Sequence, residues 1–189
     1  NCPFQYYIDY LANPVSEEEE GEALTRGLLI HRVLKSYMEI YREDINSALD
    51  RGVSHGTDAD RVRQLVEEAN RGVIEPFTPW YVQYLTEMVV RFLAADQERL
   101  SRTGFRIAGM EESFEFYIDS SIRIYGRADR IDQNTSGQRW VVDYKTGSKT
   151  PDKARLISGK EFQLPIYSMA YNDAYVSYGK VKDASFAHI

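Results

Sequence analysis

The sequence has 189 residues, of which 43% are hydrophobic and 28% are charged, and its 29 acidic side chains outnumber 23 basic ones for a formal net charge of −6. A chain of this length and composition can bury a core of its own, which excludes an intrinsically disordered protein. Its one cysteine, Cys2, excludes a disulfide framework within the chain, and no apolar run reaches the roughly 18 residues of a membrane-spanning helix.

The same features predict a cellular setting. Because a single cysteine fits a reducing compartment and no secretory signal peptide is visible, we expect a cytoplasmic protein with no membrane partner. The sequence begins at Asn1 without a methionine and ends at Ile189 just after an apolar stretch, so we expect it to be an excerpt from a longer protein.

Residues 1–103 are predicted to be mainly helical. The aromatic-rich residues 1–12 can form a short amphipathic helix. Three longer helices are predicted at residues 22–43, 59–71 and 80–102. Apolar side chains at three- and four-residue steps predict the buried faces, which are Leu24, Leu28, His31, Leu34 and Met38 in the first of these helices, and Tyr84, Met88, Phe92 and Ala95 in the third.

Residues 104–189 change character and are predicted to form an α/β part. Runs rich in Ile, Val, Phe, Tyr and Trp predict strands at residues 111–118, 121–132 and 138–145, followed by a basic loop at 146–160, a helix at 162–174 and a strand at 182–188. Helices followed by strands, a helix and a strand predict one mixed α/β domain with a helical N-terminal half.

Two carboxylates are predicted to meet on neighbouring strands. Asp143 and Lys145 end one strand, and their alternation with Tyr144 puts them on a shared face, where they could form a simple surface ion pair. Folding the hairpin about residues 133–137 brings Asp129 beside Asp143. Because two adjacent carboxylates repel each other, a cation such as Mg²⁺ or Mn²⁺ is expected to join them, and Lys145 beside it could act on a water or on phosphoryl charge.

Three further side chains could belong to this site. His31 lies on the apolar stripe of the first long helix, where it could be a core histidine or complete a metal shell. Gln163 and Tyr167 are spaced i, i+4 on one helix face, which suits either packing at the edge of the core or ordering of an active site.

The basic loop is a candidate contact for phosphates. Residues 145–160 hold five basic side chains and one acidic one. The loop could be merely solvated, but beside a metal site it predicts backbone-phosphate contacts from Lys149, Lys153, Arg155 and Lys160. No base-reading motif is visible, so little sequence specificity is expected.

Together these motifs resemble a known family. The segments are Arg-Gly-Leu-Leu-Ile-His31, Gly-Arg-Ala-Asp129, Val-Val-Asp143-Tyr-Lys145-Thr-Gly and Gln163-Leu-Pro-Ile-Tyr167. In this order they resemble the RecB-type branch of the PD-(D/E)XK nucleases, and the opening Asn-Cys2-Pro-Phe-Gln-Tyr-Tyr is similar to the start of AddB-type nuclease domains.

The resemblance implies a fold and a set of site residues. It implies a single nuclease domain over residues 1–189 with a restriction-endonuclease-like core, in which helices flank a mixed central sheet, the helical residues 1–103 carry His31 and residues 104–189 form the catalytic core. The implied metal ligands are His31, Asp129, Asp143 and the carbonyl of Tyr144. Lys145 would be the catalytic lysine, supported by Gln163 and Tyr167, and Glu112 on the first strand is an outside candidate.

The resemblance also implies partners and cofactors. It implies a Mg²⁺-dependent deoxyribonuclease, an exonuclease rather than an endonuclease, that works with a helicase domain or subunit in DNA repair and recombination. Relatives of this type hold an iron–sulfur cluster on four cysteines, and Cys2 takes the place of the first, so a cluster needs cysteines outside this chain. The alternatives are a nuclease-fold module that binds DNA or a protein without cutting, and a purely structural α/β domain.

Overall fold

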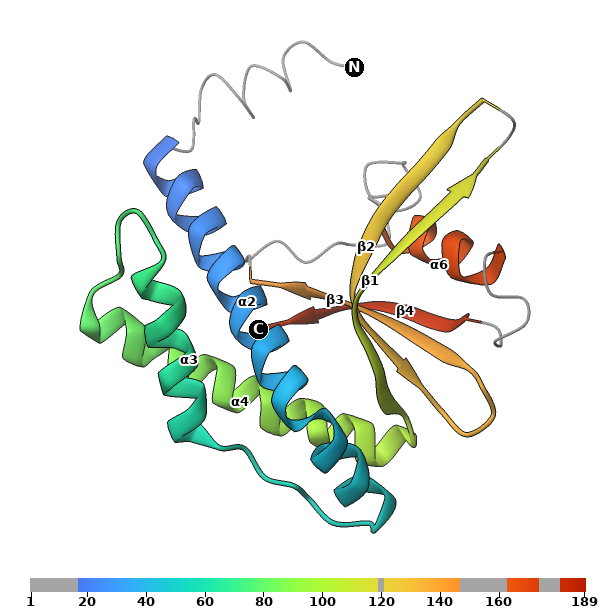
Figure 1. The fold of residues 1–189 in the computed structure, drawn as a ribbon, viewed down its shortest axis with the longest axis horizontal. Helices are drawn as coiled ribbons and strands as arrows, with labels where there is room; N and C mark the ends of the chain where they lie inside the picture. The colour runs from blue at the N-terminus through green and yellow to red at the C-terminus, as the bar shows by residue number, and fades with distance from the viewer. Residues whose placement is uncertain (1–16, 119–120, 147–162, 174–180) are drawn as a thin grey trace, which may run out of the picture.

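The computed structural model describes residues 17–118, 121–146, 163–173 and 181–189. Its elements are α2 (Glu17–Asp50), α3 (Ala59–Arg71), α4 (Pro79–Thr103), β1 (Arg106–Tyr117), β2 (Arg123–Gln133), β3 (Arg139–Lys145), α6 (Gln163–Asp173) and β4 (Val181–His188) (Figure 1). The predicted order of helices, three strands, helix and strand is therefore confirmed. The predicted helix at residues 1–12, Cys2 and the basic side chains of the loop after Lys145 lie outside the described residues.

The helix ends follow from local chemistry. The N-terminus of α3 is capped by Asp58, whose carboxylate accepts the backbone N–H of Arg61 at 2.9 Å. Thr78 caps α4 with Pro79 in the first turn, and Gly104 ends it in the left-handed conformation at φ 74°.

Helix α2 is longer at both ends than the predicted residues 22–43. Its last two turns bury Ile45, Ala48 and Leu49 in the core.

The sheet is mixed, with strand order β1-β2-β3-β4. The first three strands are antiparallel neighbours and β4 runs parallel to β3. Strand β1 begins five residues earlier than predicted, because the Asn46 side chain on α2 hydrogen-bonds both the N–H and the C=O of Ile107, at 3.0 and 2.9 Å. This tertiary contact has no local sequence pattern.

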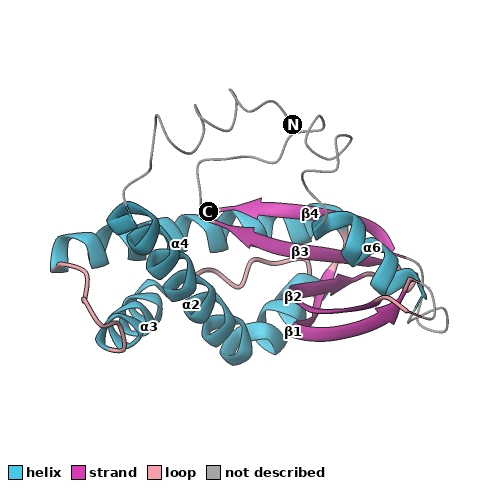
Figure 2. Ribbon diagram, turned by 90° about the horizontal axis from the view of Figure 1, so that it is seen from above, coloured by secondary structure: helices cyan, strands magenta, loops and turns pink. Residues whose placement is uncertain are grey.

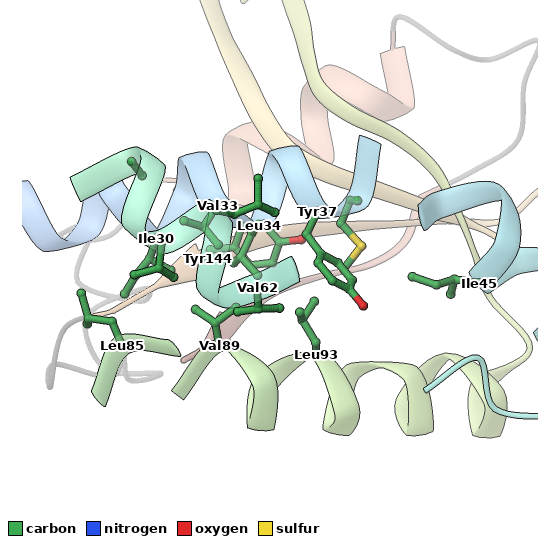
Figure 3. Close-up of a cluster of buried hydrophobic side chains, with 14 of the residues drawn as sticks. Ile30, Val33, Leu34, Tyr37, Ile45, Val62, Leu85, Val89, Leu93 and Tyr144 are labelled. Atoms are coloured by element: carbon green, nitrogen blue, oxygen red, sulfur yellow. The ribbon is translucent and has the colours of Figure 1, made fainter. Parts of the chain in front are cut away.

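Helices cover both faces of the sheet (Figures 1 and 2). Helices α2, α3 and α4 pack on one face and share a core with Val142 and Tyr144 of β3, whose tyrosine ring points into it (Figure 3). Helix α6 packs on the other face, where Tyr167 and Tyr171 meet apolar residues of all three antiparallel strands. The expected α/β fold with flanking helices is confirmed.

The predicted buried faces of two helices were partly wrong. Leu24 and Leu28 of α2 are 66% and 62% exposed, whereas Leu34 and Met38 are buried as expected. A second apolar stripe competes for the core, and the side chains that it buries are Leu29, Ile30, Val33 and Tyr37. On α4, Tyr84 is likewise exposed, and the residues that face the core instead are Val82, Leu85, Val89 and Leu93.

A buried charge cluster joins the sheet to α4. Arg130 of β2 is fully buried, and its guanidinium contacts both carboxylate oxygens of Asp96 at 2.7 and 2.9 Å. Asp132, also fully buried, lies 2.9 Å from Arg130 Nε and 2.6 Å from Arg99 Nη2. Two arginines thus offset two aspartates inside the helical face.

Within the described ranges no helix is both long and apolar enough to cross a membrane.

Candidate active site

The β2–β3 hairpin brings the two predicted carboxylates together. Arg130 pairs with Val142 and Ile131 with Val141, so the same register places Asp129 across from Asp143. Val141 faces α6 while Val142 and Tyr144 face α2 and α4. The alternation that the sequence predicts along β3 is confirmed.

Asp129 contacts both His31 and the backbone of β3. One oxygen of its carboxylate lies 3.3 Å from His31 Nδ1, and the other accepts the N–H of Tyr144 at 2.7 Å. The second ring nitrogen, His31 Nε2, lies 3.0 Å from the carbonyl oxygen of Tyr144. His31 therefore bridges a carboxylate and a backbone carbonyl, at the point where α2 crosses the end of β3.

This arrangement favours a protonated His31. A carboxylate and a carbonyl both accept hydrogen bonds, so the ring must donate from both nitrogens, which only the imidazolium can do. The hydrogen bond to Asp129 accordingly raises the pKa of His31 above its ordinary value of 6.5, and burial only partly opposes this. In this state His31 supplies positive charge next to Asp129.

Asp143 lies in a second set of contacts, toward α6. Its side chain is nearly buried, with Oδ2 2.6 Å from Lys145 Nζ. Gln163 Nε2 and the Tyr167 hydroxyl both donate to Oδ1, the latter at 3.0 Å. Lys145 in turn donates to Gln163 Oε1 at 2.8 Å. The i, i+4 pair on α6 thus holds the carboxylate and the ammonium in one orientation.

Burial tunes the acidity of this second set. It raises the pKa of the Asp143 carboxyl, which repulsion from Asp129 raises further while the Lys145 ammonium opposes the rise. Burial also raises the pKa of the Tyr167 phenol, so Tyr167 stays a neutral hydrogen-bond donor. A cation placed near the two carboxylates would relieve their repulsion.

The side chain of Tyr144 fixes the peptide that both sets share. Its hydroxyl accepts a hydrogen bond from Arg130 Nη1 at 3.1 Å, and its ring meets those of His31 and Phe92 edge to face, with centroids 5.8 and 5.6 Å apart. Its N–H and C=O point to Asp129 and His31. The buried charge cluster around Arg130 therefore supports the site from behind.

One group beside the site was missed by sequence reasoning. Glu111 lies opposite Asp129 in the β1–β2 register, and one of its oxygens contacts Lys35 Nζ at 2.5 Å and Arg127 Nη1 at 3.3 Å. The outside candidate Glu112 makes no such contact in the described part of the chain; its carbonyl accepts from the Tyr171 hydroxyl. The i, i+4 spacing of His31 and Lys35 on α2 could have indicated that Lys35 lies beside the site. A carboxylate that pairs with Lys35, here Glu111, would then have been expected nearby.

The predicted site residues that the structure describes fall into two groups. His31, Asp129 and Tyr144 converge, and so do Asp143, Lys145, Gln163 and Tyr167. Among the residues that the structure describes, no three His, Cys, Asp or Glu side chains are arranged to hold a metal ion on their own. The ligand assignment therefore stays a prediction, as do the roles of Lys149, Lys153, Arg155, Lys160 and Cys2, which lie outside the described residues.

Comparison with known proteins bears on the family. The family model for the PD-(D/E)XK nuclease superfamily matches residues 1–189. The chain belongs to the PD-(D/E)XK nuclease superfamily. The resemblance of its motifs to this superfamily is thereby confirmed over the whole sequence, and the fold agrees with it.

Within the PD-(D/E)XK superfamily, the chain is similar to proteins that are named as parts of larger assemblies. Two relatives carry the name of a subunit of an ATP-dependent helicase/deoxyribonuclease, one from Clostridium perfringens (29% identical over 196 residues, 88% of this chain) and one from Streptococcus uberis (24% over 178 residues, 89% of this chain). The chain spans only 16% and 15% of these relatives, so it corresponds to one portion of a much longer protein in each case.

Proposed function

We propose that this chain is a divalent-metal-dependent deoxyribonuclease that hydrolyses DNA phosphodiesters. One observation carries the proposal: a nearly buried Asp143 is paired with Lys145 on one side and faces Asp129 across the hairpin. A carboxylate pair beside an oriented ammonium is suited to hold a metal-bound phosphate and to assist attack on it. The names of the relatives supply the substrate, DNA, since each is named as part of a helicase/deoxyribonuclease.

The residues present fit Mg²⁺ in kind and number. Mg²⁺ prefers oxygen ligands, keeps several waters, and is usually bound by one or two carboxylates together with substrate phosphates. Asp129, Asp143 and the Tyr144 carbonyl oxygen are donors of this kind, so three convergent side chains are not required. His31 would be a further ligand once it has lost its proton. A bound divalent cation would polarise the phosphate and acidify a water.

The residues of this chain have distinct tasks in hydrolysis. A water oxygen forms a bond to phosphorus, the P–O bond to the leaving sugar oxygen breaks, and that oxygen takes up a proton. Lys145 is placed to orient the water or to offset the negative charge that develops on the phosphoryl oxygens. Gln163 contacts both Asp143 and Lys145, and Tyr167 donates to Asp143, so the two α6 side chains hold the carboxylate and the ammonium in place.

The finer features of the proposal come from the family resemblance. We propose Mg²⁺, or Mn²⁺ in its place, and exonuclease rather than endonuclease action. Work next to a helicase domain or subunit is supported by the names of the relatives. Cytoplasmic DNA repair and recombination as the setting rests on the family resemblance alone. An iron–sulfur cluster involving Cys2 requires cysteines beyond this sequence. We also propose one domain over residues 1–189, because helices before and after the strands pack on the same sheet.

The test is cleavage of end-labelled linear DNA and of closed circular DNA, with Mg²⁺, Mn²⁺ or EDTA. We expect cleavage of linear DNA with either metal, none in EDTA, and little attack on circles. Cleavage of circular DNA at the rate seen for linear DNA would overturn only the proposal of exonuclease action, and the nuclease assignment would stand. Binding of DNA without cleavage under any metal would contradict the enzyme assignment and favour a module that binds without cutting.

A further inference from the structure

The β1–β2 hairpin extends beyond the rest of the sheet. Strand β2 pairs with β3 only at residues 130–133, so residues 113–117 of β1 and 123–127 of β2 pair only with each other and form an arm that projects past β3 and β4 (Figure 1). One face of the arm is covered by α6, through Phe114, Phe116 and Ile124. The opposite face, here called the open face, consists of Ser113, Glu115, Tyr117, Arg123, Tyr125 and Arg127.

The open face alternates aromatic and basic side chains. Tyr125 is 77% exposed and Arg127 is 59% exposed. Arg123 lies over the Tyr125 ring, with its guanidinium carbon 5.8 Å from the ring centroid. Side chains two residues apart on a strand are about 6.7 Å apart, so these groups form a linear row.

The row leads directly into the candidate active site. Two residues after Arg127 on β2 comes Asp129, which contacts His31. Lys35, one turn after His31 on α2, meets Arg127 at the shared carboxylate of Glu111. Glu111 is the one non-glycine residue with positive φ in the described ranges, at 47°, where β1 passes the site. Two cations are thus held at the junction between the open face and Asp129.

We infer that the open face binds single-stranded DNA and guides it to the active site, an inference that rests on the proposed function. Tyr125 stacks on an unpaired base, and Lys35 and Arg127 contact the phosphates next to the one that is cut. Single-strand binders combine exposed aromatic rings with cations along the backbone, and stacking needs a base that is not already stacked in a duplex. A single strand therefore fits this row better than double-stranded DNA does.

The existing ion pairs on the open face do not block this role. Arg123 pairs with Glu115 at 2.6 Å, and both side chains are about half exposed. Exposed pairs of this kind stabilise a protein by only about 0–1 kcal/mol, so a phosphate can replace a glutamate as the partner.

Another exposed aromatic surface is less suited to DNA. Trp80 is 73% exposed and lines a groove of about 1000 Å³ between α2 and the start of α4. Glu22 and Glu75 also line this groove, with Arg32 as its basic residue. Carboxylates outnumber basic groups in this groove, whereas Lys35, Arg123 and Arg127 outnumber Glu111 and Glu115 at the open face and its junction with the site. We therefore assign the binding of single-stranded DNA to the hairpin arm, and Trp80 serves as a control of matched exposure.

The experiment measures equilibrium binding of a fluorescent single-stranded oligonucleotide and of a blunt duplex, in EDTA, at several salt concentrations. Tyr125→Ala should weaken single-strand binding by roughly five- to hundred-fold and change duplex binding much less. Tyr125→Phe, which keeps the ring, should restore it. Lys35→Gln and Arg127→Gln should each lower the salt slope for single strands by about 0.7. Trp80→Ala and Arg91→Gln on α4 are the matched controls and should bind as the wild type does.

The outcomes separate this inference from the proposed function. If the wild type cuts DNA but Tyr125→Ala binds single strands unchanged, the open face is not the path and the nuclease assignment stands. A loss in Trp80→Ala in place of Tyr125→Ala, or equal losses for single strands and duplex, would also overturn the inference. If the wild type neither binds nor cuts DNA, the proposed function fails and the inference fails with it.

Discussion

At the scale of single residues, the site balances charge before any metal is present. Asp129 faces His31, whose two ring nitrogens both meet acceptors, and Asp143 faces Lys145. Each carboxylate therefore has its own cation, and the hydrogen bond to Asp129 raises the pKa of one of them, His31. The two cations differ in purpose: we assign His31 to the ligand set and Lys145 to the transition state.

The protonated state of His31 predicts a pH dependence of metal-free stability. Because Asp129 raises the pKa of His31 in the folded protein, protonated His31 stabilises the fold fully below its unfolded pKa of about 6.5, and this stabilisation is lost as pH rises through the higher folded pKa. In EDTA, the difference in unfolding free energy between the wild type and His31→Gln should thus shrink with rising pH. Urea unfolding from about pH 5 to 8 measures it.

A matched variant checks the cause. In an Asp129→Asn background, which removes the main reason for the raised pKa, His31→Gln should show much less pH dependence. Asp143, whose pKa is also raised, is present in all four proteins, so the part of its contribution that does not depend on His31 cancels from the differences. A difference that grows with pH would contradict the bridging role of His31.

Substitution of Lys145 and neutralisation of the basic loop are predicted to have different effects on cleavage and on DNA binding. Lys145→Met keeps most of the stem and removes the charge, so single-turnover cleavage should slow by roughly 100- to 1000-fold while DNA affinity changes little, because the charge acts mainly in the transition state.

Neutralising Lys149, Lys153, Arg155 and Lys160 should instead weaken binding of every DNA sequence, and lower the salt slope by about one unit per lost contact. Unchanged binding and slope would place the DNA away from this loop.

At the scale of elements, the hairpin and α4 are held together by buried charge. The Arg130 guanidinium contacts Asp96, Asp132 and the Tyr144 hydroxyl, and through Tyr144 it reaches the peptide that faces Asp129 and His31. The partners Arg130 and Arg99 hold the pKa of the Asp96 carboxyl below its ordinary value in spite of burial. Removal of one member would leave buried charge without compensation.

Arg130→Met should therefore destabilise the protein by about 3–5 kcal/mol in urea unfolding. The control is Arg106→Met, because Arg106 pairs with Asp50, whose side chain is 69% exposed, and its loss should cost less than about 1 kcal/mol. Comparable losses in the two variants would mean that the buried cluster does not hold β2 and β3 on α4.

Sequence reasoning captured what depends on local pattern and missed what depends on packing. The limits of α3 follow from Asp58 and the apolar period, and the facing of Asp129 and Asp143 follows from hairpin parity. The burial of α2 was partly misassigned, because apolar residues occupy two stripes and only the neighbouring helices decide between them. Arg130 is fully buried although it is charged and lies next to Asp129, because its carboxylate partners are Asp96 on α4 and Asp132 two residues farther along β2, and no local sequence pattern predicts these contacts.

At the scale of the whole molecule, one sheet connects two helical layers to one site. Helix α2 brings His31 from one face, α6 brings Gln163 and Tyr167 from the other, and the β2–β3 hairpin places both aspartates between them. Neither layer holds the site alone. The parallel strand β4 pairs with β3 along its length, including Asp143 and Lys145, whereas β2 pairs with β3 only at residues 139–142. Strand β4 therefore holds the end of β3 that carries both site residues.

The most direct test of the central claim is single-turnover, Mg²⁺-dependent cleavage of labelled DNA by Asp143→Asn beside the wild type. Asparagine keeps the shape of the side chain and removes its charge, so far-UV circular dichroism and DNA affinity should stay close to those of the wild type. Because Asp143 is proposed both to hold the cation and to orient Lys145, cleavage should fall by roughly 100-fold or more. Cleavage by Asp143→Asn at the wild-type rate would contradict the account.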